Sequence, residues 1–223
     1  MKNLVQSYFD GAANIYDEIT HGVNAWNMPE LVENIISDLN LKIVKALIFG
    51  VGTGQEIYIL KNKGVEYITA IDISEKMLNI ARAKYDDIEL IHCDVLNARD
   101  KVIEKFDLIL CVGVAEFIED KNKLIHECLH YLSDSGHLIF TYEPIITGHP
   151  VQSSKSQLIH SREQNPDYNC DGVYLYRNDV QEIINCYSLS NAECIFHKLS
   201  LAYHESYDIF YGVVGLRKNN YEG

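Results

Sequence analysis

Three glycines stand where a strand is expected to give way to a helix. Gly50, Gly52 and Gly54 lie in the stretch LIFGVGTGQE, after a short apolar run and before a segment with helical periodicity. Because glycine has no Cβ, backbone N–H groups at such a turn can approach a ligand closely. The spacing predicts a ligand-binding loop, although a glycine-rich turn also occurs for steric reasons alone.

Two acidic residues follow this loop, each at the end of a further apolar run. Asp72 comes about 20 residues after the first glycine, and Asp94 comes about 20 residues after Asp72. Asp72 could accept two hydrogen bonds from a ribose diol, and Asp94 could accept one from an adenine amine. Ile73 and Val95 would then flank the adenine ring. Capping of the next helix is the alternative role for such an Asp, but after Asp72 the better cap is Ser74, which would leave the Asp72 carboxylate free.

Short apolar runs alternate with segments of helical periodicity between residues 44 and 143, which is typical of βαβ units. Five parallel strands are predicted from VKALIFG, EYITAID, IELIHCD, KFDLILCVG and GHLIFTYE, the last after a turn at SDSG. A further helix, RNDVQEIINCYS, has Asn178 or Asp179 as its cap. The runs AECIFHKLSLAYH and YDIFYGVVGLRK predict a closing hairpin. The chain is therefore an α/β protein whose strand carboxyl ends gather the glycine loop and both acids.

Two segments lie outside this alternation. Residues 1–40 have apolar side chains at helical spacing, with a second helix beginning near Pro29, and predict a helical cap. The core then spans residues 41–223. Within it, residues 144–176 are polar and rich in turn formers, which predicts a lid or insertion over a site.

Composition limits the classes of function. Of 223 residues, 47% are hydrophobic and 23% are charged, as in ordinary globular chains. The net charge of −13 repels phosphate backbones and anionic lipids, so nucleic acid and membrane surfaces are not expected as partners. Six cysteines without a C-x-x-C pair, and the lack of a long apolar stretch, predict a cytoplasmic protein.

The motifs together resemble a known family. LIFGVGTGQE, IDISEKMLNIA and HCDVL, followed by FDLILCVGVAEFIED and LHYLSDSGHLIF, are similar to the class I S-adenosylmethionine-dependent methyltransferases. The similarity is greatest to the small-molecule branch that includes the ubiquinone- and menaquinone-biosynthesis type. It implies a Rossmann-like, seven-stranded, mostly parallel sheet with an antiparallel last strand, S-adenosyl-L-methionine as the cofactor, and a small-molecule acceptor.

The resemblance also implies positions for the cofactor. Asp72 would bind the ribose, Asp94 would lie near the adenine, and the tyrosines of the N-terminal helix would lie near the sulfonium. The cofactor-binding residues implied in this way are Tyr16, Gly50, Gly52, Gly54, Asp72, Ile73, Met77, Asp94, Val95 and Gly113.

Residues for contact with the acceptor are predicted from their place after the fourth and fifth strands or on the N-terminal segment. They are Tyr8, Trp26, Glu116, Phe117, Tyr142, Glu143 and His149. Packing of the aromatic side chains and helix capping by Glu116 are the alternative explanations. No catalytic group is assigned, because in-line methyl transfer depends mainly on alignment and exclusion of water.

One position departs from the family pattern. Two residues before the first glycine the family usually has an acid, which anchors the cofactor's amino group indirectly, and here Ile48 stands instead. Weaker cofactor binding, a compensating group such as Glu116, and a non-catalytic or regulatory homologue are the open alternatives.

Two other motifs compete with this interpretation. His126, Glu127 and His130 form H-E-x-x-H, the zinc-protease arrangement, but all three are expected to face solvent, and the glycine of the extended signature is absent. We therefore predict no metal. A nicotinamide dinucleotide fold would need a third glycine where Gln55 stands.

Overall fold

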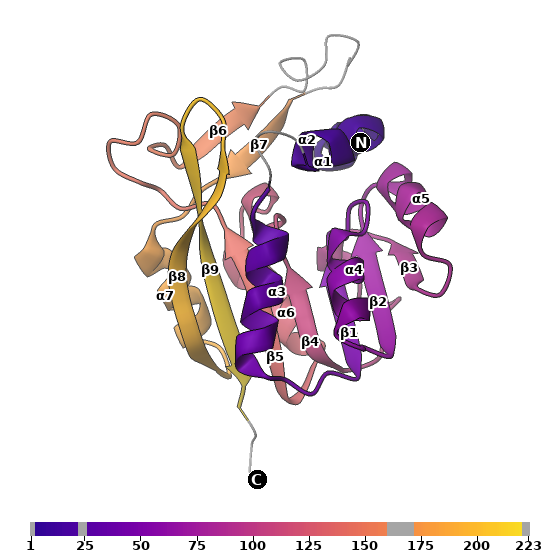
Figure 1. The fold of residues 1–223 in the computed structure, drawn as a ribbon. Coiled ribbons are helices and arrows are strands. Elements are labelled where there is room, and N and C mark those ends of the chain that lie inside the picture. Colours follow the sequence, from indigo (N-terminus) through magenta and orange to yellow (C-terminus); the bar gives the residue numbers. More distant parts are fainter. Residues whose placement is uncertain (1–2, 22–25, 160–171, 220–223) are drawn as a thin grey trace.

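A seven-stranded sheet forms the centre of the computed structural model, which describes residues 3–21, 26–159 and 172–219 (Figure 1). The strand order is β3-β2-β1-β4-β5-β9-β8. The strands are β1 (Lys45–Phe49), β2 (Tyr67–Asp72), β3 (Glu89–His92), β4 (Phe106–Cys111), β5 (Leu132–Tyr142), β8 (Ala192–His204) and β9 (Asp208–Lys218). The first five are parallel, and β9 is antiparallel to both β5 and β8. The predicted sheet and its closing hairpin are confirmed.

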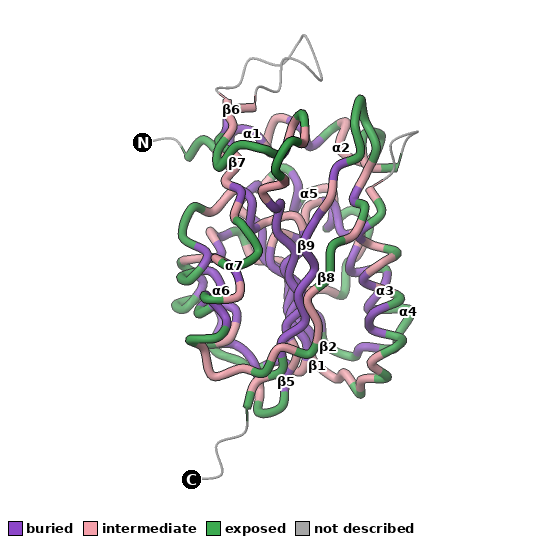
Figure 2. The backbone as a smooth tube through the Cα atoms, turned by 90° about the vertical axis from the view of Figure 1, so that its left-hand side faces the viewer, coloured by how far each residue is buried: buried purple, intermediate pink, exposed green. Residues whose placement is uncertain are grey.

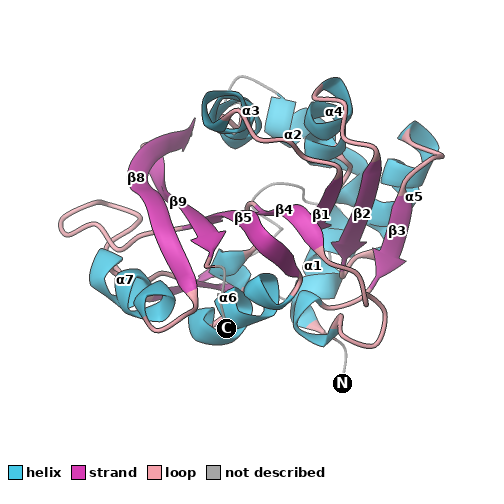
Figure 3. Ribbon diagram, turned by 90° about the horizontal axis from the view of Figure 1, so that it is seen from below, coloured by secondary structure: helices cyan, strands magenta, loops and turns pink. Residues whose placement is uncertain are grey.

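Helices cover both faces of the sheet (Figure 3). One face carries α3 (Met28–Leu39), α4 (Gln55–Asn62) and α5 (Glu75–Lys84), and the other carries α6 (Lys121–His130) and α7 (Val180–Ser188). Ser74 caps α5 by accepting from the Met77 amide, and Asp179 caps α7 by accepting from the Glu182 amide, as predicted.

The central strands are buried between these layers (Figure 2). In β1, Leu47 and Phe49 pack on the α6 side, whereas Ala46 and Ile48 pack on the α3 and α4 side. Burial of each large aliphatic side chain stabilises the folded state by about 1.5–3 kcal/mol. The loop after β1 therefore begins from a tightly packed strand. Ile48 is 1% exposed and belongs to this core.

The N-terminal residues divide between two positions. The segment of α1 (Leu4–Ala12), η1 (Ala13–Ile15) and α2 (Tyr16–His21), called here the N-terminal helices, lies across the carboxyl ends of the strands (Figure 1). In contrast, α3 buries Met28, Val32 and Ile35 against the sheet. Of the predicted cap at residues 1–40, the part up to residue 21 therefore lies over the sheet edge.

The predicted lid contains a small antiparallel ribbon of β6 (Ser156–Ile159) and β7 (Val173–Tyr176), and its residues 160–171 lie outside the described part of the chain. Arg177, directly after β7, donates from Nε to Glu143 Oε1 at 2.7 Å, and both side chains are buried. This ion pair attaches the end of the ribbon to the end of β5.

The turn predicted at SDSG is wrong, because residues 133–136 belong to β5. The strand begins at Leu132, opposite Phe106, and its pairing with β4 shifts register before Leu108. Ser135 adopts a φ of 61°, so a local irregularity within the strand takes the place of a turn. Among the described helices, none has the length and apolar character to cross a membrane.

Candidate functional site

A cavity of about 430 Å³ opens at the carboxyl ends of β1, β2 and β4, with the N-terminal helices on its other side. This volume is within the range of small-molecule sites. Most of the predicted cofactor residues line it, namely Tyr16, Gly50, Gly52, Asp72, Ile73, Met77, Asp94, Val95 and Gly113. Of the predicted acceptor residues, Trp26 and Phe117 also line it.

The glycine loop follows β1 with three positive φ angles, and each glycine has its own reason. A Cβ on Gly50, whose φ is 71°, would lie 2.3 Å from Val114 Cγ2. A Cβ on Gly52 would approach Tyr16 Cε1 at 3.7 Å on the cavity wall. Gly54 is not on the wall, and its Cβ would lie 2.8 Å from the Tyr85 ring. Close packing therefore explains Gly50 and Gly54, and Gly52 leaves room beside the cavity.

Asp72 joins the loops that follow β1 and β2. Its Oδ2 accepts from the Gly52 amide and its Oδ1 from the Ser74 amide, both at 2.8 Å. The expectation that the carboxylate is left free is therefore wrong. Two of its approximately four lone-pair positions remain for a ligand. Burial raises the pKa of Asp72 to about 6, and the two amides partly oppose that shift.

Asp94 has the capping role weighed from the sequence and also lies on the cavity wall. Its Oδ1 accepts from the Leu96 amide at 2.9 Å and caps η2 (Val95–Asn97), and the residue also lines the cavity. Ile73 and Val95 lie on the same wall, so an apolar surface accompanies the acid. Contact of Asp94 with an adenine amine stays a prediction.

The remaining acceptor candidates lie away from the cavity wall, and each has a structural partner. Tyr8 packs against Phe9 and Phe117, with ring centroids 5.3 and 6.4 Å away. The other partners are Tyr211 for Glu116, His197 for Tyr142, Arg177 for Glu143, and the Asp208 carbonyl for His149. Their contact with an acceptor stays a prediction that the cavity does not support.

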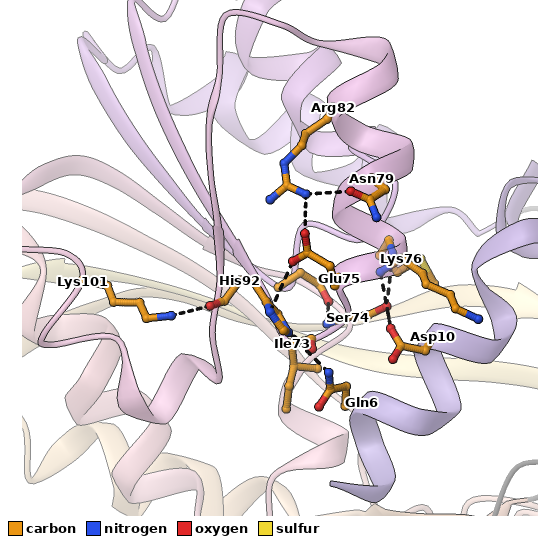
Figure 4. A network of polar contacts seen from close by, with 12 residues as sticks. Gln6, Asp10, Ile73, Ser74, Glu75, Lys76, Asn79, Arg82, His92 and Lys101 are labelled. Carbon is orange, nitrogen blue, oxygen red and sulfur yellow. Dashed lines mark hydrogen bonds and ion pairs between the residues drawn. The ribbon is translucent and has the colours of Figure 1, made fainter. Parts of the chain in front are cut away.

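A polar network attaches α1 to the loop after β2 (Figure 4). Asp10 Oδ1 accepts from Ser74 Oγ at 2.7 Å. Gln6 Nε2 lies 3.4 Å from His92 Nε2, which in turn contacts the Ile73 carbonyl oxygen at 2.9 Å. Side chains from α1 thus hold the same loop that supplies Asp72 and Ile73, and the sequence analysis did not single out Asp10 or Gln6.

Glu56 is a second residue that the sequence analysis missed. It lies in the first turn of α4, lines the cavity and is 7% exposed. Burial, followed by the neighbouring charge of Asp72, raises the pKa of Glu56 to about 7. The available signal was an acid at the start of the helix that follows the glycine loop.

The residues of the H-E-x-x-H motif do not line the cavity. His126 and His130 are exposed, but Glu127 is buried, so the expectation that all three face solvent is wrong for Glu127. Its carboxylate pairs with Arg99 Nε at 2.9 Å and accepts from the Tyr131 hydroxyl. Within the described ranges, no three His, Cys, Asp or Glu side chains form a group that could hold a metal.

The known proteins to which this chain is similar include methyltransferases. Residues 47–140 match a family described as a methyltransferase domain. The malonyl-[acyl-carrier protein] O-methyltransferase of Bacillus anthracis is 26% identical over 147 residues, which is 63% of this chain and 52% of that protein. The ubiquinone biosynthesis O-methyltransferase of Coxiella burnetii is 25% identical over 116 residues, or 51% of this chain and 49% of that protein. The chain thus spans about half the length of these curated relatives.

Solved structures share the fold. An S-adenosylmethionine-dependent methyltransferase from Clostridium acetobutylicum has a TM-score of 0.70 at 16% identity and covers 93% of this chain and 98% of its own. Magnesium protoporphyrin IX methyltransferase from Synechocystis, solved with bound S-adenosylmethionine, has a TM-score of 0.67 at 14% identity, covering 96% and 95%.

Proposed function

We propose that this chain, whose residues 47–140 match a methyltransferase domain and whose fold is shared with S-adenosylmethionine-dependent methyltransferases, transfers a methyl group from S-adenosyl-L-methionine to a small-molecule acceptor. The proposal rests above all on Asp72, a buried carboxylate at the end of β2 that lines the cavity. The relatives named for O-methylation, one of them for a malonyl-[acyl-carrier protein], support an acceptor that is a small molecule or a small group carried on a protein.

The residues of the cavity fit this cofactor. The remaining lone pairs of Asp72 suit a ribose diol, and Ile73 and Val95 offer apolar surface for an adenine. The bound cofactor supplies an electrophilic methyl group on a sulfonium. The chain's own part is to orient the ligand, exclude water and place aromatic faces of Tyr16, Trp26 and Phe117 beside the reacting end.

We place the acceptor at the β4 side of the cavity, under the N-terminal helices and the ribbon of β6 and β7. Gly113 and Phe117 follow β4 on this wall, and Tyr176 at the end of β7 reaches the same cavity. Residues 1–25 and 144–176 then act as a closing cap that selects the acceptor. S-adenosylhomocysteine is expected to slow proteolysis near Ser153–Lys155, and unchanged cleavage at saturating ligand would contradict the cap.

Ligand binding tests the proposal directly. S-adenosylhomocysteine should raise the melting temperature, because a ligand at about 100 times its Kd stabilises the folded state by about 2.7 kcal/mol. NAD should have no effect. Stabilisation by NAD but not by S-adenosylhomocysteine would overturn the proposed function.

A cofactor-binding homologue without turnover is the second candidate, and one observation favours it. Ile48 is buried in the core between Ala70 and Leu110 of the neighbouring strands, so the usual acid at this place is missing. Formation of S-adenosylhomocysteine from S-adenosylmethionine with a panel of small acceptors separates the two candidates. We also propose a reducing, cytoplasmic location, which the free thiols at Cys93, Cys111 and Cys128 support.

A further inference from the structure

Among the buried acids of the described chain, Glu56 alone has no hydrogen bond or ion pair to another residue. Its carboxylate interacts with its own backbone amide, and no hydrogen bond or ion pair joins it to another described side chain. The other buried acids are paired: Glu127 with Arg99, Glu143 with Arg177, Glu116 with Tyr211, and Asp72 with two backbone amides. A buried charge without compensation is costly, so this one points to a ligand.

The groups around Glu56 cannot supply the missing charge. Asp72 is acidic, and the hydroxyls of Tyr16 and Tyr85 are neutral in the physiological range. Lys84 is already paired with Asp17 at 2.6 Å, and Lys61 with Asp87 at 2.6 Å. Thr53 Oγ1 already donates to Asp17 Oδ1 at 2.6 Å. The first turn of α4 therefore presents a buried carboxylate to the cavity, and the neighbouring charge of Asp72 adds to its negative field.

The strand order fixes which part of a ligand would meet Glu56. Along the edge of the sheet, Asp94 follows β3, Asp72 ends β2, the glycine loop and Glu56 follow β1, and Gly113 follows β4. If adenine lies over β3 and ribose over β2, the amino-acid end of the cofactor lies over the β1 loop. That end carries an ammonium, which can donate hydrogen bonds to a carboxylate.

We infer that Glu56 is the counter-ion of the ligand's cationic group, and that under the proposed function this group is the ammonium of the cofactor's methionine part. Glu56 then takes the compensating role that the sequence analysis considered for Glu116. Glu116 is buried and bonded to Tyr211, and it is not on the cavity wall. In this assignment Glu56 is a binding residue. Its carboxylate replaces the acid that the family usually has at the position of Ile48 in β1.

Titration calorimetry at pH 8 on Glu56→Gln, with Glu116→Gln as the matched buried control, tests this inference. Glu56→Gln should weaken S-adenosylmethionine and S-adenosylhomocysteine by the same factor, about 10- to 100-fold, because both carry the ammonium. Glu116→Gln should stay within about threefold of wild type. Equal affinities of Glu56→Gln and wild type, or a larger loss in Glu116→Gln, would overturn the assignment.

Two further readouts separate the possible failures. A loss confined to S-adenosylmethionine would show that Glu56 faces the sulfonium and would overturn the ammonium assignment. Wild-type protein should bind S-adenosylhomocysteine more weakly at pH 6 than at pH 8 and release a proton on binding near pH 6.5, because the carboxyl of Glu56 has a raised pKa. Glu56→Gln should release fewer protons than the wild type, with the remainder coming from Asp72, whose pKa is raised to about 6, and an unchanged release would contradict the inference.

The proposed function can fail independently of Glu56. If the wild-type protein binds neither S-adenosylmethionine nor S-adenosylhomocysteine at any pH, the function is wrong. If it binds both and Glu56→Gln binds them equally well, the function stands and the role of Glu56 is wrong. If the variant fails to fold, the wild-type protein still tests the role of Glu56: an analogue of S-adenosylhomocysteine without the amino group should bind at least about 10-fold more weakly at pH 8, and equal affinity would overturn the assignment.

Discussion

The cavity has two walls that are attached to the molecule in different ways. The sheet-edge wall consists of the loops after β1, β2 and β4, where Gly50 donates to the Ile71 carbonyl and Gly52 donates to Asp72, both at 2.8 Å. The N-terminal helices are held by polar side-chain contacts, such as Asp10 with Ser74 and Lys84 with Asp17, and by a small apolar cluster of Ala12, Ala13 and Met77. The first wall belongs to the core, and the second is docked onto it.

Because the two walls are attached differently, substitutions in them should have different effects on stability and on ligand affinity. A buried polar group that loses its partner costs about 1–3 kcal/mol, whereas an exposed ion pair contributes about 0–1 kcal/mol. Substitutions in the sheet-edge wall should therefore disturb both stability and cofactor affinity. Substitutions in the N-terminal helices should change affinity while leaving the sheet folded.

The largest effect is expected for Asp72→Ala. It removes the acceptor of the Gly52 and Ser74 amides, at about 1–3 kcal/mol for each, as well as the expected ribose contacts. Affinity for S-adenosylhomocysteine should fall by about 100-fold or more, and Asp94→Ala should cost less because an adenine amine contact is a single bond. Titration calorimetry and urea unfolding measure both quantities. Equal losses for the two variants would contradict the assigned roles.

The second-largest effect is expected for Gly50→Ala, which should lower the free energy of unfolding. The new Cβ meets Val114 at 2.3 Å with φ at 71°, which should cost about 2–5 kcal/mol of unfolding free energy. Gly148→Ala is the matched control, because Gly148 has φ of 79° but no atom within 4 Å of the new Cβ. The control should cost about 1–2 kcal/mol, and similar losses for the two would show that the loop after β1 is not tightly packed.

The next prediction concerns the pH dependence of the unfolding free energy, to which Glu56 on the cavity wall should contribute. Its pKa in the folded protein is raised to about 7, so the folded state holds a proton that the unfolded chain releases above about pH 4.5. Its contribution to stability is therefore lost as pH rises toward 7. Glu56→Gln should flatten the decline in unfolding free energy between pH 5 and 8 by about 1–3 kcal/mol. Glu18→Gln, at an exposed site on α2, should leave the slope unchanged.

The smallest effect is expected for Asp10→Ala, which breaks the contacts of α1 with Ser74 Oγ and the Lys76 amide. Unfolding free energy should fall by about 0.5–1.5 kcal/mol, the contribution of a typical hydrogen bond, whereas dissociation of S-adenosylhomocysteine should accelerate a few-fold. Stopped-flow displacement measures the rate, with Asp86→Ala as an exposed control. A large loss of stability would show that the N-terminal helices are part of the folding core.

The sequence determined the fold because the information is local and repetitive. Apolar runs separated by helical segments require a parallel sheet, and the right-handed connections of such units bring Gly50, Asp72 and Asp94 to one edge. The caps Ser74 and Asp179 could also be predicted, because a helix cap depends on neighbours in the chain.

The tertiary structure alone decided how the side chains are partnered. Nothing near Asp72 in the chain shows that it bonds the Gly52 amide, and nothing near Glu116 or Tyr142 shows that Tyr211 and His197 hold them outside the cavity. Glu56 was missed for the same reason. An acid at the start of a helix is common, and its lack of a partner becomes visible only when every element packed around it is in place, because the cost of a buried charge depends on the three-dimensional surroundings.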